Sequence, residues 1–507
     1  RQSANIAAET EYISRFFITQ CPTTLGYVAA MRGLRAPRPT EPFTYCDLGC
    51  GKGLTVNVLA AAMPQARFYG VDLSADHIEA ARRTATAGGL LNATFIKDDF
   101  ANLAEREDLP AFDFIALQGV YSWVDADARQ KIQQTVRRLL KPEGLLYVSY
   151  NALTGWAPFL PIRQTLRLLV GQASGTPAER AAAAFRYIRE VAERAPYFQN
   201  SPAARKLLDE VAKEKRGYVI HEFLAGAWDL FTFDEVAEEM ASIGLSYCGS
   251  ALLEPNAGDT GLAPELQPAA RAIADPIAAE AVRSFLKAER YRADIFSMSR
   301  PAEGWLGRWD DFADQVFGPP MGVMQEPQVR GGALAESVRA FFAVTQTGRA
   351  SLAQIAKMEP FSGADTETML RIAHAATRTF ARRPYARPAL EEVVGPDRIR
   401  LALPIHEILL AMAEEESRVA LPSPVLGTGI ILPFAAAFIL DAACRVGVQG
   451  ALEPAVRRLL DSERVWTHDG KRLETEKEIR PAMAQVHGEF RDRWLPFLLR
   501  AGVVEAA

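Results

Sequence analysis

Cysteine and uninterrupted apolar sequence are both scarce in this chain. Its 507 residues include five cysteines, and no two of them form a CxxC pair. We therefore expect neither a disulfide framework nor a zinc site, and this cysteine usage fits a reducing cytoplasm. The first residues lack a long apolar core, so we expect no secretion signal. The longest apolar run, residues 424–440, is broken by two glycines and a proline, and it predicts a buried helix with its lead-in loop rather than a membrane span.

Excess basic charge is also missing. Lysine and arginine together number 57, against 62 aspartates and glutamates, which gives a net charge of -5. A general nucleic-acid binder is usually basic, so we do not expect one here. The apolar content of 49% and the charged content of 23% are ordinary for a globular protein, and the length predicts two or three domains. The composition leaves the oligomeric state open.

A glycine-rich turn near the N-terminus is the most informative stretch that is present. Residues 44–53 read TYCDLGCGKG, so an apolar-led strand runs directly into the turn, and an alanine-rich helix follows over about residues 54–63. Gly49, Gly51 and Gly53 allow a sharp turn and a close approach of the backbone to a ligand. A turn of this kind is a weak signal when it occurs alone.

Acidic residues follow the next two predicted strands. The second strand, residues 67–71, ends at Asp72, where a carboxylate can hold the two hydroxyls of a ribose. The third strand, residues 93–97, is followed by Asp98, Asp99 and Phe100. An acid at this place can meet an adenine amino group. Together the turn and the acids predict a nucleoside-bearing cofactor across the carboxyl ends of a parallel sheet. The spacing of the three glycines differs from the GxGxxG pattern of dinucleotide sites.

The motifs DLGCGKG, VDLS and KDDF, at residues 47–53, 71–74 and 97–100, occur in this order at the right spacing. This series resembles that of class I S-adenosylmethionine-dependent methyltransferases over about the first 150 residues. The resemblance implies an α/β, Rossmann-like fold with a seven-stranded sheet, and S-adenosylmethionine as cofactor. A Rossmann-like NAD enzyme, or a fold that has lost its ligand, is the alternative.

The same resemblance implies a set of cofactor-binding residues. The turn from Asp47 to Gly51 would cradle the methionine moiety, Asp72 would hold the ribose, and Asp99 would meet the adenine. Tyr12 lies in the helical stretch that precedes the core, where it can reach the cofactor or simply pack against the core. The complete expected set is Tyr12, Asp47, Gly49, Gly51, Asp72, Leu73, Asp98, Asp99, Phe100 and Gln118.

The order of predicted elements divides the chain into five parts. These are, in order, a helical cap (1–42), a cofactor-binding core (43–154), a helical insertion (155–230), the completion of the sheet (231–300) and a mostly helical region (305–507). The strand–helix alternation of the core is typical of a doubly wound sheet. We expect segments 245–253 and 291–298 to be its last two strands.

The C-terminal region is expected to contain winged-helix-like units. Segments 335–344, 352–356 and 366–381 would form three helices, and segments 382–387 and 399–403 would pair as a wing. Residues 465–471 look like a hairpin within a second helical unit.

Four residues are candidates for the methyl-transfer channel. Tyr121 and Trp123 follow the fourth predicted strand, residues 112–117, and aromatic rings there can wall a channel for an amine, although Trp123 can equally pack a helix. Tyr150 and Asn151 end the fifth strand, and an asparagine oxygen can accept a hydrogen bond from the attacking N–H. His221 and Glu222 are more simply explained by packing, and none of the six histidines has the spacing of a metal ligand, so we expect no metal.

Five further segments occur in a recognisable order: residues 12–34, GVYSWV at 119–124, SYN…GW at 149–156, HEFL at 221–224 and YRADIF at 291–296. They resemble bacterial methyltransferases that carry a methyltransferase regulatory domain, a group that includes the rickettsial outer-membrane-protein lysine methyltransferases. The resemblance covers about residues 1–300 and implies methylation of lysine side chains in a protein. The sequence departs from the pattern at Gln118, where histidine is common.

The sequence therefore favours a cytoplasmic, S-adenosylmethionine-dependent protein-lysine N-methyltransferase. One alternative is a small-molecule or natural-product methyltransferase, or a carboxylate O-methyltransferase. Another is a cofactor-sensing regulator that binds nucleic acid through the C-terminal region, where residues 371–387 hold five arginines.

Overall fold

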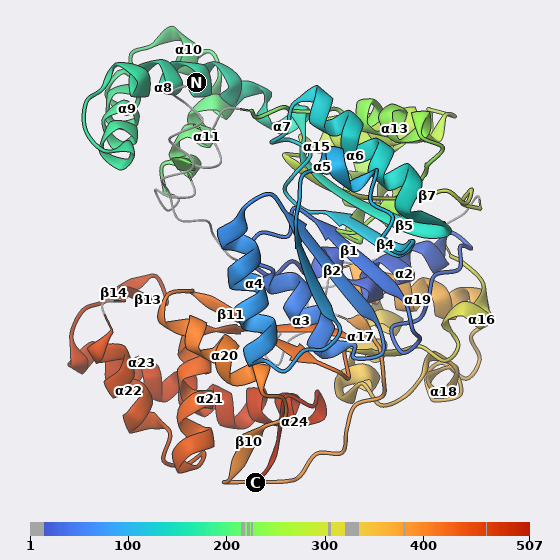
Figure 1. Cartoon of the computed structure of the whole chain (residues 1–507). Coiled ribbons are helices and arrows are strands. Elements are labelled where there is room, and N and C mark those ends of the chain that lie inside the picture. Colours follow the sequence, from blue (N-terminus) through green and yellow to red (C-terminus); the bar gives the residue numbers. More distant parts are fainter. Residues whose placement is uncertain are drawn as a thin grey trace.

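A seven-stranded sheet lies at the centre of the computed structural model, with helices on both faces and two large additions (Figure 1). The structure describes residues 15–213, 219–220, 224, 227–302, 306–319, 334–378, 382–462 and 464–507. Tyr12, His221 and Glu222 lie outside the described residues.

The strand order is β3-β2-β1-β4-β5-β7-β6. The strands are β1 (Thr44–Leu48), β2 (Arg67–Asp72), β3 (Ala93–Lys97), β4 (Phe112–Leu117), β5 (Leu140–Asn151), β6 (Ser246–Ser250) and β7 (Tyr291–Ser297). The first five strands are parallel, and β7 runs antiparallel to both β5 and β6. This arrangement confirms the predicted class I methyltransferase sheet.

Each face of the sheet has its own apolar layer. We call the first the α2 face, because it packs against α2 (Pro22–Met31), α3 (Leu54–Ala62) and α4 (Ala75–Ala87). We call the second the α6 face, which is covered by α5 (Phe100–Leu103), α6 (Ala126–Leu139), α13 (Phe233–Ser242) and α15 (Pro276–Lys287). With both faces covered, β1 is buried along its whole length.

The helical insertion follows β5 and forms a core of its own. It consists of α7 (Leu153–Trp156), α8 (Leu160–Gln172), α9 (Pro177–Ala192), α10 (Pro196–Gln199) and α11 (Pro202–Val211). Proline in the first turn fixes the start of α9 and α11, and Thr176 and Glu179 add a capping box to α9. Figure 1 shows α8 to α11 standing away from the sheet.

Short elements connect the late strands and open the C-terminal region. Between β6 and β7 lie η4 (Glu254–Gly261), η5 (Pro264–Leu266), α14 (Gln267–Arg271) and α15. After β7 come α16 (Trp309–Phe312), β8 (Val316–Gly318), α17 (Ala335–Val344), α18 (Leu352–Ile355), α19 (Thr366–Arg378), β9 (Arg383–Tyr385) and β10 (Ile399–Leu401).

The three expected helices are present as α17, α18 and α19, but the predicted wing pairs differently. Strand β9 pairs with the earlier β8, and β10 pairs with β15 (Val504–Ala506) at the end of the chain. The prediction that segments 382–387 and 399–403 pair with each other is therefore wrong. Arg382 and Arg383 are buried, so this segment runs through the interior instead of forming an exposed loop.

The rest of the C-terminal region contains two hairpins among helices. Its elements are α20 (Ile405–Ala411), β11 (Arg418–Ser423), β12 (Thr428–Pro433), α21 (Phe434–Val446), α22 (Leu452–Asp461), β13 (Trp466–His468), β14 (Lys471–Leu473), α23 (Glu476–Glu489) and α24 (Leu495–Arg500). The hairpin β13–β14 was predicted, whereas the apolar run at 424–440 holds strand β12 as well as helix α21. Among the described residues, no helix is both long enough and apolar enough for a bilayer crossing.

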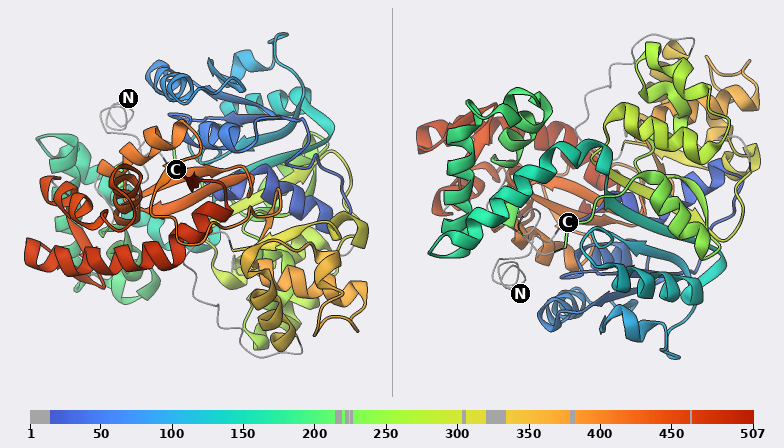
Figure 2. Two further views of the ribbon diagram at one scale, coloured as in Figure 1. Left: turned by 90° about the horizontal axis from the view of Figure 1, so that it is seen from below. Right: turned by 90° about the horizontal axis from the view of Figure 1, so that it is seen from above.

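The C-terminal region packs against the α2 face. Gly429 of β12 lies against Val58 of α3 and against Phe16, and the apolar residues of both regions form one continuous cluster. In the left view of Figure 2 the orange and red C-terminal elements lie against the blue sheet domain.

Candidate functional site

The glycine turn after β1 takes a conformation that only glycine adopts without strain. Gly49 has φ +87°, and a Cβ atom there would lie 2.4 Å from the Val120 side chain. The N–H groups of Gly49 and Cys50 donate to the Val71 carbonyl, at 2.8 Å and 3.0 Å. The turn is thus held against the end of β2, directly before the start of α3.

Asp72, at the end of β2, is held as a carboxylate by the turn itself. Its two oxygens accept hydrogen bonds from the backbone N–H groups of Gly51 and Ser74, both at 2.9 Å, and Oδ1 lies 3.2 Å from His77 Nδ1. Burial raises the pKa of Asp72, but these hydrogen bonds outweigh burial and lower the pKa below its usual value. Oδ2 accepts from the Gly51 N–H with one of its two lone pairs, so its second lone pair can accept from a ribose hydroxyl.

The predicted adenine side lies next to Asp72. Leu73 has 68% of its surface exposed and offers an apolar face there. Asp99 caps α5 by accepting from the Asn102 N–H at 3.0 Å, and Phe100, which follows it, is partly buried. Asp98 is instead tied into the loop by Arg106, at 2.9 Å. Burial raises and this hydrogen bond lowers the pKa of Asp98, with a net lowering, so Asp98 shapes the loop.

Asp47 is a buried carboxyl group with an unsatisfied oxygen. Burial, with a smaller effect from the charge of Asp72, raises the pKa of Asp47 to about 7. Within the described part of the chain, Asp47 Oδ1 and the hydroxyl of Tyr45 have no hydrogen-bond partner. The two residues are two apart on β1 and so share the α2 face. Buried unpaired polar atoms are costly, so this pair fits a ligand that brings a cationic amine, such as the methionine moiety of S-adenosylmethionine.

A polar cluster that the sequence did not reveal lies on the same face. Gln118 Oε1 accepts hydrogen bonds from the hydroxyls of Tyr147, at 2.5 Å, and Tyr291, at 3.2 Å. Thr19, from the segment before α2, lies 3.0 Å from the Tyr147 hydroxyl. Gln118 directly follows β4 and Tyr291 opens the antiparallel β7, so both lie at the carboxyl edge of the parallel strands, where Gln118 was expected. Tyr147 lies four residues before Asn151, and this even spacing was an available signal.

Two of the four expected channel residues lie on the opposite face. The Tyr150 hydroxyl donates to Asp294 Oδ2 at 2.6 Å, and Arg292 binds the same carboxylate at 2.9 Å. Tyr121 is fully buried, donates to Glu239 of α13 and accepts from Gln133 Nε2 at 3.0 Å. These contacts lie on the α6 face, so both tyrosines contribute to packing there, contrary to the expectation that they line the channel.

The structure places Asn151 and Trp123 differently from the two tyrosines. Asn151 is on the α2 face with Tyr147, and its backbone N–H donates to Ser122 Oγ at 2.9 Å. Its side chain is nearly buried, at 8% exposure. Trp123 is partly buried against the apolar core of the insertion, which agrees with the packing alternative.

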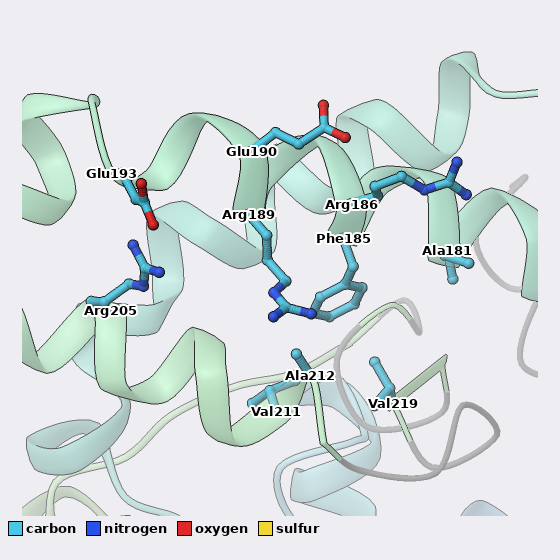
Figure 3. Close-up of a pocket in the computed structure, with 11 residues that line it drawn as sticks. Ala181, Phe185, Arg186, Arg189, Glu190, Glu193, Arg205, Val211, Ala212 and Val219 are labelled. Atoms are coloured by element: carbon cyan, nitrogen blue, oxygen red, sulfur yellow. The ribbon is translucent and has the colours of Figure 1, made fainter.

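The insertion contains a cavity that is separate from these residues. It has a volume of about 600 Å³ and lies between α9 and α11. Figure 3 shows Phe185 and Arg189 pointing into it, and Glu193 facing Arg205 at one end. None of the predicted cofactor or channel residues lines this cavity. The described residues also contain no group of three or more metal-ligating side chains.

Comparisons with known proteins agree with the fold. Residues 40–194 match the methyltransferase domain family, and residues 215–297 match the predicted methyltransferase regulatory domain. An uncharacterized protein of Synechocystis is 30% identical over 504 residues, with 98% of each chain covered. An uncharacterized protein of Rickettsia prowazekii is 29% identical, over 43% of this chain and 86% of that protein.

A solved structure extends the likeness to the whole chain. PKMT2 from Rickettsia typhi, in complex with AdoHcy, has a TM-score of 0.74 and 17% sequence identity, and the match covers 97% of this chain and all of that one. At this identity the match shows the fold alone.

The sheet order and the glycine turn define a class I, S-adenosylmethionine-dependent methyltransferase. More narrowly, the chain belongs to the family of methyltransferases that carry a methyltransferase regulatory domain.

Proposed function

We propose that this enzyme transfers the methyl group of S-adenosylmethionine to lysine nitrogen in a protein. The observation that carries the proposal is the arrangement on the α2 face. A glycine turn with an unsatisfied Asp47 lies at the end of β1, and the uncharged polar residues Gln118 and Asn151 lie at the ends of β4 and β5, with the Tyr147 hydroxyl bonded to Gln118.

The cofactor would lie along the carboxyl edge of the sheet. Asp47 and the turn at Gly49–Gly51 would hold its methionine end, and Asp72 would accept from the ribose hydroxyls. Leu73, with Asp99 and Phe100, would border the adenine. The unpaired oxygen of Asp47 supports this placement, because a buried carboxylate gains most from a cationic partner.

The cofactor supplies an electrophilic methyl group on a sulfonium, and the protein must position the acceptor in line with it. The acceptor nitrogen forms the new N–C bond as the C–S bond breaks, and the product amine then releases a proton. Positioning supplies most of the catalysis in such a displacement. Asn151 is the candidate for holding the attacking N–H, because its side chain lies on the face that carries Asp47.

A protein acceptor is favoured by the amount of surface beside the site. The insertion and the C-terminal region both add structure beyond the core, whereas a small-molecule enzyme needs little more than a lid (Figure 1). The order of the motifs from residue 119 to residue 296, which resembles lysine methyltransferases, supports the same acceptor.

The nucleic-acid alternative loses its main support. Of the five arginines in residues 371–387, Arg382 and Arg383 are buried and Arg371 pairs with Glu367. Arg383 donates to Thr24 Oγ1 at 2.8 Å. These side chains therefore do not form an exposed basic patch.

The N-methyl and O-methyl alternatives can be separated by the stability of the product. Enzyme, bacterial lysate protein and methyl-tritiated S-adenosylmethionine would be incubated together, and the labelled protein would then be treated with mild alkali. Methyl esters release volatile methanol under these conditions, whereas methylated lysine retains the label. We expect retention of the label in the protein, and release of most of it as methanol would favour the carboxylate O-methyltransferase.

A further inference from the structure

Two tyrosines from different strands meet one glutamine at the carboxyl edge of the sheet. Tyr291 opens β7 and lies opposite Asn151 of β5 in the register of the sheet. Its hydroxyl donates to Gln118 Oε1 at 3.2 Å, and the Tyr147 hydroxyl donates to the same oxygen at 2.5 Å. Tyr291 is 36% exposed, so a molecule outside the sheet can reach its ring and hydroxyl, while Tyr147 is buried beneath it.

The proton count of this cluster decides which kind of group it can bind. A tyrosine hydroxyl has one proton and two lone pairs. Gln118 Oε1 accepts from both tyrosines, so both protons point at the same amide oxygen. The two hydroxyl oxygens are 3.3 Å apart, so either hydroxyl can donate to the other when it does not donate to Gln118. In each arrangement the Tyr291 oxygen keeps a lone pair that can accept from a donor outside the sheet.

The buried member of the pair stays protonated. Burial, helped by the nearby Tyr291 hydroxyl, raises the pKa of Tyr147 well above its usual value. Tyr147 therefore acts as a neutral hydrogen-bonding group and takes no proton from an acceptor at physiological pH. Thr19 lies 3.0 Å from the Tyr147 hydroxyl, and Tyr147 is fully buried, so its hydroxyl supports Tyr291 from within the structure.

We propose that Tyr291, oriented by Gln118 and backed by the buried Tyr147, forms the acceptor wall of the site, and that its hydroxyl oxygen accepts an N–H hydrogen bond from the amine that is methylated. This inference rests on the proposed function and names a residue for it. The arrangement favours a neutral amine, which still carries N–H donors, over a carboxylate, which has only lone pairs to offer. It adds Tyr291 to the site beside Asn151.

Sinefungin tests this wall without knowledge of the acceptor. In this cofactor analogue an amine-bearing carbon replaces the methylsulfonium, so its amino group points where the methyl group is transferred. S-adenosylhomocysteine has no group at this position. Calorimetric titration of the full-length protein with both ligands therefore isolates the contribution of the wall from that of the rest of the cofactor site.

Tyr291→Phe is expected to weaken sinefungin binding about five- to tenfold, as for the loss of one hydrogen bond, and to leave S-adenosylhomocysteine binding within about twofold. Tyr291→Leu, which also lacks the hydroxyl, is expected to act in the same direction. Tyr69→Phe is the matched control, because it removes a hydroxyl from the α6 face, beside Phe112.

The possible outcomes are distinct. Equal weakening of both ligands by Tyr291→Phe, or no weakening of either, would overturn the acceptor wall while leaving the cofactor site intact. Failure of the wild-type protein to bind either ligand would instead refute the proposed function, and the wall with it. If Tyr291→Phe melts well below the wild type, Tyr291→Leu would be tested in its place, with the same outcomes expected.

Discussion

Asp47 combines deep burial with a pKa raised to about 7, and this combination links cofactor binding to pH. Burial is the main cause of the shift, and the Asp72 carboxylate adds to it. A cationic amine placed at the unpaired oxygen would stabilise the charged form. The proton on Asp47 must therefore leave when the cofactor binds.

The affinity for S-adenosylhomocysteine should consequently rise with pH and level off above pH 7. Below the pKa each pH unit should cost up to about tenfold in affinity, because the ionised fraction falls by that factor. Calorimetry between pH 5.5 and pH 8.5 measures this change. Asp47→Asn should bind weakly and without the slope, and a wild-type affinity that is flat over this range would contradict the role given to Asp47.

Asp72 should contribute strongly to cofactor affinity, because its carboxylate is placed to accept from the ribose hydroxyls. Replacing it with alanine removes the acceptor for the ribose hydroxyls and also the hydrogen bond that holds the Gly51 N–H. We expect a loss of roughly 1.5–3 kcal/mol in binding free energy, the usual scale for hydrogen bonds to a charged group. Ser74→Ala, which removes only the cap of α4, serves as the control in the same titration, since it should change the affinity little.

At the scale of elements, strand β5 shows what the sequence could and could not predict. The turn and its flanking strands were placed correctly because their signals are local: glycines, apolar runs and acids at fixed spacing. The position of Tyr150 relative to Asn151 depends on the two-residue period of a strand, and adjacent residues cannot face the same channel. Tyr291 could not be assigned from the sequence, because its role depends on the register of β7 against β5.

Tyr150 and Asn151 are adjacent at the end of β5, and replacing each in turn compares the two faces of the sheet. Tyr150→Phe loses the hydrogen bond to Asp294 and should lower the free energy of unfolding by about 1 kcal/mol while turnover stays near the wild-type value. Asn151→Ala should lower turnover far more than cofactor affinity, as expected for an interaction made chiefly in the transition state. Steady-state kinetics with a labelled acceptor measures turnover, and urea unfolding measures stability. If Tyr150→Phe lowered turnover more than Asn151→Ala, the assignment of the acceptor to the α2 face would be wrong.

At the scale of the whole molecule, the C-terminal region fixes the segment that brings Thr19 to the site. Cys21 Sγ lies 3.1 Å from Thr428 Oγ1, and Tyr27 of α2 hydrogen-bonds to His374 of α19. His374 Nε2 lies 2.9 Å from the Leu306 carbonyl. The C-terminal region thus contributes to the geometry of the site, although the sequence alone had left its role open.

His374 makes this contact sensitive to acid. Burial lowers the pKa of His374 to about 4, whereas an unfolded histidine takes up a proton near pH 6.5. Between these values the unfolded chain binds the extra proton, so stability falls as the pH falls through this window. Urea unfolding should show that this loss is smaller in His374→Gln than in the wild type by up to about 1.4 kcal/mol per pH unit, while His406, whose pKa burial also lowers to about 4, still contributes. Identical pH profiles for the two proteins would contradict a neutral, buried His374.

The most direct test of the central claim is to find which atom receives the methyl group. Bacterial lysate protein would be incubated with the enzyme and S-adenosylmethionine carrying an isotopically labelled methyl group, and tandem mass spectrometry would locate the label. The account predicts labelled methyl groups on lysine side chains with the wild-type enzyme, and strongly reduced labelling with Asn151→Ala. Label confined to carboxylates or to small molecules, with lysines unlabelled, would contradict it.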